Sequence, residues 1–224
     1  ANGATLQIEA GVEVHFAQDG VIFVNPGGRL LVAGSAEAPV TLRGQGDAAA
    51  GHWRHIYAYL SATVQLDQCR ILHAGRNGAG AVEIYGSTVT LRDCVIQESG
   101  GPGVLLGSAA ISPRLERLHL AQNVGPGIRQ ATVDMNPTYI GVSMSGNGLD
   151  AVEIPTSTVG RNVTLNGPLD ALGGLPFVVD KLTVASGQSL TITAGTQLHF
   201  RTDGLLYVNP GGRLLVAGSA EAPV

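Results

Sequence analysis

Four segments in the middle of the chain align with one another at a regular spacing of about 24 residues. They begin at Val64 (VQLDQCRILHAG), Val89 (VTLRDCVIQESG), Arg114 (RLERLHLAQNVG) and Thr138 (TYIGVSMSGNG), and a Gly-rich turn and another strand-like stretch follow each one. A short period repeated in register indicates a solenoid, in which each coil covers the apolar edge of the previous coil. We therefore predict an all-β parallel β-helix with about 24 residues and three short strands per coil.

The composition agrees with short strands and tight turns. The chain has 224 residues, of which 44% are apolar, 13% are charged and 32 are Gly. Apolar and polar residues alternate in stretches such as TLQIE from Thr5, and no helical apolar pattern lasts for ten residues. The net charge of −4 gives no electrostatic footprint for nucleic acid, and no apolar run is long enough for a membrane span.

A second, longer period spans almost the whole chain. The residues Asn25–Val40 return letter for letter as Asn209–Val224. The wider stretches Gly3–Val40 and Gly187–Val224 agree at 26 of 38 positions without a gap. We therefore divide the chain into one long module, residues 1–184, and the continuous start of a second copy, residues 185–224.

The coil spacing predicts the dimensions of this module. Strands in adjacent coils lie about 4.8 Å apart, so one long repeat should advance the axis by roughly 35 to 40 Å. Inward residues should stack in columns, among them Val82, Val104, Ile128 and Val152. The less regular stretch 155–182 is expected to hold the join between one module and the next.

Several strings resemble one known family. They are TLQIEAGVEVHF from Thr5, DGVIFVNPGGRLLVAGSAEAPVTLRG from Asp19, GHWRHI from Gly51 and DQCRILHAG from Asp67. In this order they look like the right-handed parallel β-helix repeats of large secreted bacterial surface proteins, which share the pectin-lyase-like superfold. A later string, LGGLPFVVDKLTVASGQSLTITAGTQLHF from Leu172, is similar to the start of the next such module. The resemblance implies the fold but not the function, because enzymes, tailspikes and adhesins all use this superfold.

One outward column could carry chemistry. On the strand that follows each aligned segment, the outward residues read Glu83, Leu105, Arg129 and Glu153. The two carboxylates should lie three coils apart, about 14 Å, which exceeds the roughly 5 to 9.5 Å between the carboxylates of glycosidases. We therefore predict no catalytic residues and no enzyme activity. Glu83, Arg129 and Glu153 are instead expected to form a solvated, partly ion-paired strip, and they are the candidate binding residues.

The histidines do not form a metal site in this interpretation. His52 and His55 are three residues apart in GHWRHI, so a strand would place them on opposite faces. His73 and His119 have no acidic or cysteine neighbour at ligand spacing. We predict no metal and no cofactor.

Two further residue pairs are expected to be structural. Cys69 and Cys94 occupy equivalent inward positions in consecutive coils, with Cα atoms about 5 Å apart. We favour a buried thiol pair, and a disulfide stays open. Asn123 and Asn147 lie in the turns of successive coils, where stacked side-chain amides can satisfy backbone groups.

These features predict a structural, non-enzymatic repeat unit of an extracellular or cell-surface fibre, sheath or filament. Neither end shows a capping helix or a polar closing segment, so we expect head-to-tail stacking on copies of itself, with the last coil continued by the equivalent of Thr41 onward. Extracellular polysaccharide is a further expected partner. Two alternatives stay open: an adhesin that binds a glycan or a surface, and a fragment of a polysaccharide lyase or hydrolase.

Overall fold

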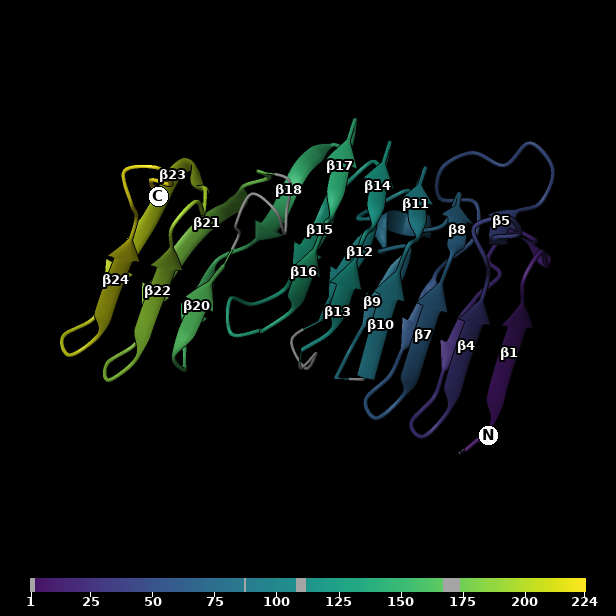
Figure 1. Ribbon diagram of the computed structural model, residues 1–224, viewed down its shortest axis with the longest axis horizontal. Helices are drawn as coiled ribbons and strands as arrows, with labels where there is room; N and C mark the ends of the chain where they lie inside the picture. Colours follow the sequence, from purple (N-terminus) through teal and green to yellow (C-terminus); the bar gives the residue numbers. More distant parts are fainter. Residues whose placement is uncertain (1–2, 87, 108–111, 167–173) are drawn as a thin grey trace.

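The computed structural model describes residues 3–86, 88–107, 112–166 and 174–224, which form a rod of stacked strands with the two chain ends at opposite ends of the rod (Figure 1). The strand pairs among these residues are all parallel. About eight turns follow one another, with about 24 residues per turn. The prediction of an all-β parallel β-helix is confirmed.

Three sheets run along the first part of the rod, and each coil contributes one strand to each sheet. Sheet A contains β1 (Thr5–Glu9), β4 (Arg29–Ala33), β7 (Thr63–Asp67), β10 (Thr88–Arg92), β13 (Arg114–Glu116) and β16 (Thr138–Ile140). Sheet B contains β2 (Glu13–Phe16), β5 (Val40–Gly44), β8 (Cys69–Leu72), β11 (Val95–Gln97), β14 (His119–Ala121) and β17 (Ser143–Ser145).

Sheet C is the longest sheet and runs on into the second module. It contains β3 (Ile22–Val24), β6 (Ile56–Ala58), β9 (Val82–Ile84), β12 (Val104–Leu106), β15 (Pro126–Gln130), β18 (Leu149–Ile154), β19 (Ser157–Val159), β21 (Phe177–Val184) and β23 (Leu198–Val208). Sheet D contains β20 (Val163–Leu165), β22 (Ser189–Thr193) and β24 (Arg213–Ala217). Helical structure in the described residues is limited to one 3-10 turn, η1 (Arg76–Gly78), and no helix there is long and apolar enough to cross a membrane.

The core is built from the inward columns that the alignment predicts. Val82, Val104, Ile128 and Val152 are paired in register and fully buried. The second column, Cys69, Cys94, Leu118 and Val142, lies one residue before in-register positions of sheet B and is buried as well. Because each coil covers the apolar side chains of the next, the core is continuous along the rod.

A single residue in the left-handed conformation turns the chain from sheet A into sheet B in successive coils. These residues are Gln68 (φ 50), Asp93 (φ 53), Arg117 (φ 48) and Gly141 (φ 58). A non-Gly residue rarely adopts such a φ, so the surrounding coils must hold it there. The repeated corner keeps the strands of sheets A and B in register from coil to coil.

The segment GHWRHI is not a strand as predicted, because β6 begins only at Ile56 and the residues before it form a loop. Trp53 anchors this loop: its ring stacks on Phe16 with centroids 4.1 Å apart, and its Nε1 donates a hydrogen bond to the carbonyl oxygen of Leu72 at 2.8 Å. Alternation along a strand therefore does not apply to His52 and His55.

The second copy uses the sheets differently from the first. In the first copy, Val14–Phe16 pair with β5 in sheet B. Their equivalents Leu198–Phe200 pair with β21, which pairs with β18 of sheet C. The strand that starts sheet B in the first module therefore extends sheet C in the second.

Candidate functional surfaces

The outer face of sheet C carries one continuous column of in-register residues. In chain order they are Phe23, Tyr57, Glu83, Leu105, Arg129, Glu153, Val178 and His199. The structure therefore brings the predicted strip Glu83, Arg129 and Glu153 into one line, as the alignment indicated. Whether the strip binds a ligand stays a prediction.

The two acidic residues of this strip are not solvated, which corrects the expectation. Glu83 is 7% exposed and Glu153 is 5% exposed, although both point away from the core. Arg129 and Arg201 each form an ion pair with the Glu153 carboxylate, one on each of its oxygens. Because a buried carboxylate needs such partners, Glu153 is fully occupied by the protein itself.

Glu83 has a different environment from Glu153. Its Oε1 accepts a hydrogen bond from the backbone N–H of Gly80 at 3.0 Å and lies 3.9 Å from His55 Nδ1. Burial raises the pKa of the Glu83 carboxyl, and burial together with the nearby Arg54 charge lowers the pKa of His55. His55 Nδ1 is buried and has no hydrogen-bond partner among the described residues. This polar pair carries at most one negative charge, and the next carboxylate of the strip, Glu153, lies three strand spacings away, about 14 Å.

An aromatic cluster surrounds this pair, and the sequence reasoning missed it. Tyr57 stacks on Tyr85 with centroids 5.0 Å apart and contacts Tyr59 at 4.4 Å. Phe23 lies 6.0 Å from Tyr57 and 6.0 Å from Tyr59. Phe23 is 47% exposed and Tyr59 is 37% exposed, so the cluster lies open on the lateral surface of the rod. We call Phe23, Tyr57, Tyr59, Tyr85 and Glu83 the aromatic platform.

A signal for this platform exists in the sequence, but it is weak. The string YAYL and the string VEIY each place a Tyr directly after the last residue of a sheet-C strand, at positions 59 and 85. The loop before β6 lengthens that coil, so a longer stretch of chain separates Phe23 from Tyr57 than separates Tyr57 from Glu83. The regular period therefore does not align the two rings.

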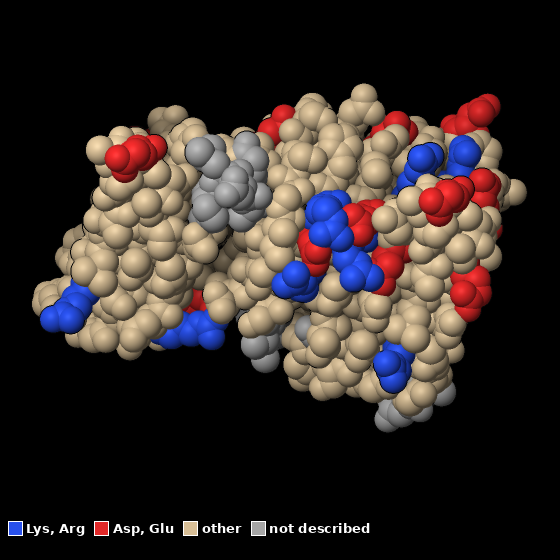
Figure 2. Space-filling model, in the orientation of Figure 1, with Lys and Arg blue, Asp and Glu red and all other residues tan. Residues whose placement is uncertain are grey.

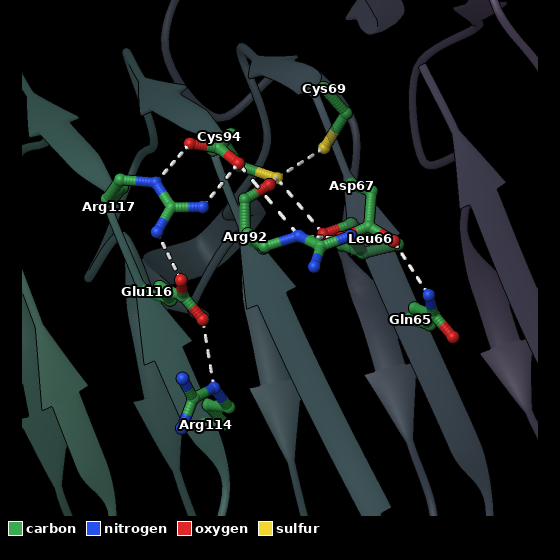
Figure 3. A network of polar contacts seen from close by, with 10 residues as sticks. Gln65, Leu66, Asp67, Cys69, Arg92, Cys94, Arg114, Glu116 and Arg117 are labelled. Carbon is green, nitrogen blue, oxygen red and sulfur yellow. Dashed lines mark hydrogen bonds and ion pairs between the residues drawn. The ribbon is translucent and has the colours of Figure 1, made fainter. Parts of the chain in front are cut away.

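A second polar surface lies at the corner between sheets A and B (Figure 3). Six side chains of both charges follow one another there: Asp67, Arg92, Asp93, Arg117, Glu116 and Arg114. Arg117 donates to both oxygens of Asp93, at 2.6 and 2.9 Å, and its hydrogen bond lowers the pKa of that carboxyl. Three acids balance three bases, so these charges satisfy one another.

The face of the rod seen in Figure 2 has little single-sign charge. On the face seen in Figure 2, acidic and basic side chains lie beside one another, and most of the area carries neither. No group of three or more His, Cys, Asp or Glu side chains within the described ranges is arranged to hold a metal ion. The predicted absence of a metal or cofactor stays a prediction.

A cavity of about 260 Å³ marks the seam between sheets A and D, where β16 and β20 are not paired. Gln130, Tyr139 and Phe177 line it, with Thr164 and Leu165 of β20. The Tyr139 hydroxyl donates to Gln130 Oε1 at 3.2 Å, and Gln130 Nε2 donates to the Thr132 carbonyl oxygen at 2.9 Å. Gln130 and Tyr139, the two buried polar side chains of this lining, therefore already have hydrogen-bond partners.

The predicted structural pairs lie where the alignment placed them. The Cys69 and Cys94 sulfurs are 3.1 Å apart and are free thiols in the core. Asn147 Oδ1 accepts hydrogen bonds from the backbone N–H and the side-chain amide of Asn123, at 3.1 and 2.7 Å. Asn123 Oδ1 in turn accepts from the Ser99 backbone N–H at 3.0 Å, so the amide ladder links three coils.

The fold and these surfaces define the class of the protein: a parallel β-solenoid whose lateral face carries an aromatic platform. Comparison with protein-family models, curated proteins and solved structures found no match.

Proposed function

We propose that this chain is a structural repeat unit of an elongated rod or fibre, in which β-helical coils stack end to end. One observation carries the proposal: the strand RLLVA occurs twice, in two environments. In β4, which lies between β1 and β7, Leu30 is 0% and Val32 is 1% exposed. In β24, which has β22 on one side only, their equivalents Leu214 and Val216 are 37% and 57% exposed.

The first coil shows the reciprocal difference. Leu6 of β1 is 49% exposed, whereas its equivalent Leu190 of β22 is fully buried. Leu190 is buried because β20 pairs with β22 and places Val163 directly beside it. Each strand sequence is therefore buried in the copy where a neighbouring coil covers it and exposed in the copy where no coil does. This difference supports a continuous stack of such coils.

Covering the exposed edge is energetically favourable. Burying one fully exposed Leu or Val side chain contributes roughly 1.5 to 3 kcal/mol. Leu214 is 37% and Val216 is 57% exposed, together about one side chain, so covering both contributes roughly 1.5 to 3 kcal/mol. A new parallel strand also satisfies the free backbone groups of β24. An arrangement of this kind does not close on itself and produces rods.

The resemblance to large secreted bacterial surface proteins of the pectin-lyase-like superfold supports an extracellular or cell-surface position for this rod. In this proposal, the coils that cover the edge belong either to the same polypeptide or to a second subunit. The next carboxylate of the strip, Glu153, lies about 14 Å from Glu83, beyond the roughly 5 to 9.5 Å of glycosidase carboxylate pairs, which supports a non-enzymatic role.

Stacking is tested with an extended chain in which residues 41–224 follow Val224 directly. Sheet C has seven strand spacings from β3 to β23, so each added module should lengthen the rod by about 34 Å. Small-angle X-ray scattering and negative-stain electron microscopy measure this length. Two separate compact bodies, or a rod of unchanged length, would refute the proposal.

Edge variants supply the matched control. Leu214→Lys with Val216→Lys places charges on the inward positions of β24, so it should abolish end-to-end association of the original chain in sedimentation velocity. Leu215→Lys alters the outward position between them, which is 52% exposed, and should leave association intact. Equal effects of the two changes would show that association does not use this edge.

A further inference from the structure

The aromatic platform lies on the lateral face of the rod, and its first ring, Phe23, belongs to β3, the edge strand of sheet C. In the second copy, the position of Phe23 is taken by Tyr207, and the outward residues of the preceding strands are Thr183 and Thr158. A preceding coil of this type therefore adds only small hydroxyl side chains beside the ring. We therefore expect an added coil to leave the outer ring surface of Phe23 uncovered.

The platform combines three kinds of group. Phe23 and Tyr59 present exposed ring surface, and Tyr57 and Tyr85 continue it along the axis from β6 to beyond β9. No hydrogen bond engages the three Tyr hydroxyls or Glu83 Oε2 within the described part of the chain, while Oε1 of Glu83 is held by Gly80. The surface thus offers apolar rings together with Tyr hydroxyl groups, and the largely buried Glu83 adds one carboxylate oxygen that no described residue engages.

We propose that the aromatic platform binds a neutral carbohydrate chain, with sugar rings lying on the exposed aromatic surface and their hydroxyl groups donating hydrogen bonds to Glu83. Pyranose rings have apolar faces and polar rims, which match apolar rings bordered by a small number of fixed polar groups. The rings follow strands that are about 4.8 Å apart, so they form an elongated surface that suits a linear chain.

The charge of the platform selects among ligand classes. Glu83 is the only acidic residue in the platform, and its carboxylate repels uronic acids. His55 is the basic residue beside the rings, 5.6 Å from Tyr57 between ring centroids, and burial lowers its pKa, which disfavours a positive charge there. A cage for an organic cation needs rings that enclose an empty space. Tyr57 and Tyr85 instead stack face to face with an interplanar angle of 12°, so they fill that space themselves.

Isothermal titration calorimetry of the intact chain with cellohexaose, laminarihexaose and mannohexaose tests the proposal. We expect at least one of these neutral hexasaccharides to bind, and hexagalacturonate and choline to bind more weakly or not at all. Phe23→Ala and Tyr57→Ala should each lower the affinity by roughly tenfold. Tyr57→Phe keeps the ring and should lower the affinity less than Tyr57→Ala.

The second copy again supplies the matched control. Tyr207 is equivalent to Phe23 and is 51% exposed, but the described residues that precede it in its column of sheet C are Thr183 and Thr158, which carry no ring. Tyr207→Ala should leave the affinity unchanged, and thermal melting of every variant checks that it is folded. The proposal is overturned if no neutral hexasaccharide binds, if hexagalacturonate or choline binds more tightly, or if Phe23→Ala and Tyr57→Ala bind as the unmodified chain does. None of these outcomes bears on stacking, which the edge variants test separately.

Discussion

Two identical leucines allow a direct test of how coil stacking stabilises this rod. Leu30 and Leu214 occupy the same position of the same strand sequence, but Leu30 is fully buried and Leu214 is 37% exposed. Leu30→Ala removes side-chain atoms from a closed core and leaves a cavity, which costs about 3 kcal/mol. Leu214→Ala removes atoms from an open edge that leaves no enclosed cavity, and we expect a cost of about 1 kcal/mol.

Calorimetry and hydrogen exchange measure the difference. Unfolding entropy is about 2.1 cal/mol/K per residue, so in a chain of 224 residues Leu30→Ala should lower Tm by about 6 °C and Leu214→Ala by about 2 °C. Coils of a solenoid can also open locally, so hydrogen exchange followed by mass spectrometry is the more specific assay. Loss of about 3 kcal/mol corresponds to roughly 150-fold faster exchange in the strands β4 and β7.

Two results would refute this reasoning. Equal losses in the two variants would mean that the strand sequence itself, and not the neighbouring coil, determines the contribution of this leucine. A larger loss in Leu214→Ala would mean that the second copy is already covered in solution. Repeating the measurement at increasing protein concentration separates these cases, because covering by another subunit depends on concentration.

Three further predictions follow from the same geometry. A Cβ at Gly34 would overlap the Gln68 carbonyl oxygen of the next coil, whereas the nearest atom to a Cβ at the equivalent Gly218 is 3.1 Å away. Gly34→Ala should therefore lower Tm far more than Gly218→Ala does. Equal shifts in Tm would contradict this prediction. The hydrogen bond between Cys69 and Cys94, together with burial, raises the pKa of the Cys69 thiol, so iodoacetamide should label neither cysteine until the chain is unfolded, as mass spectrometry can show. Burial raises the pKa of the Glu83 carboxyl above its ordinary 4.5, so the folded state binds the carboxyl proton more tightly than the unfolded state does. The folded state therefore loses stability as the pH rises from 4.5 through the pKa of the folded state. Glu83→Gln should therefore be more stable than the unmodified chain at pH 7 and lose that advantage near pH 4, and a pH-independent difference in urea midpoints would exclude the assignment.

The coil architecture could be predicted from the sequence because its signal is local and repeated. The positions of Cys69, Cys94 and Leu118 all lie in the same alternation of apolar and polar residues, and each coil repeats it after about 24 residues. An inward residue of a solenoid packs between the corresponding residues of the preceding and following coils. The positions that repeat with the period of the sequence are therefore also the buried positions. Register and core could therefore be predicted together.

The environment of the outward residues could not be predicted in this way. Glu153 is buried partly because Arg201 reaches it from a strand two coils further along the chain. Glu83 is buried beside the backbone of Gly80, in the loop that precedes its own strand. Alternation indicates that a side chain points outward, but loops and long side chains from other coils determine whether it reaches water. The aromatic platform could not be predicted for the same reason, since the loop before Tyr57 interrupts the regular sequence period.

The repeated stretch Asn25–Val40 shows which structural features depend on the local sequence and which depend on the neighbouring coils. Both copies form the same turn: Gly28 donates to the Asn25 carbonyl oxygen at 2.8 Å, and Gly212 donates to that of Asn209 at 2.8 Å. Both copies continue into the same strand, RLLVA. The burial of this strand differs, because β7 pairs with the far side of β4 and none of the described residues pairs with the far side of β24. In a solenoid, the same strand sequence is therefore buried core or exposed edge according to whether a neighbouring coil covers it.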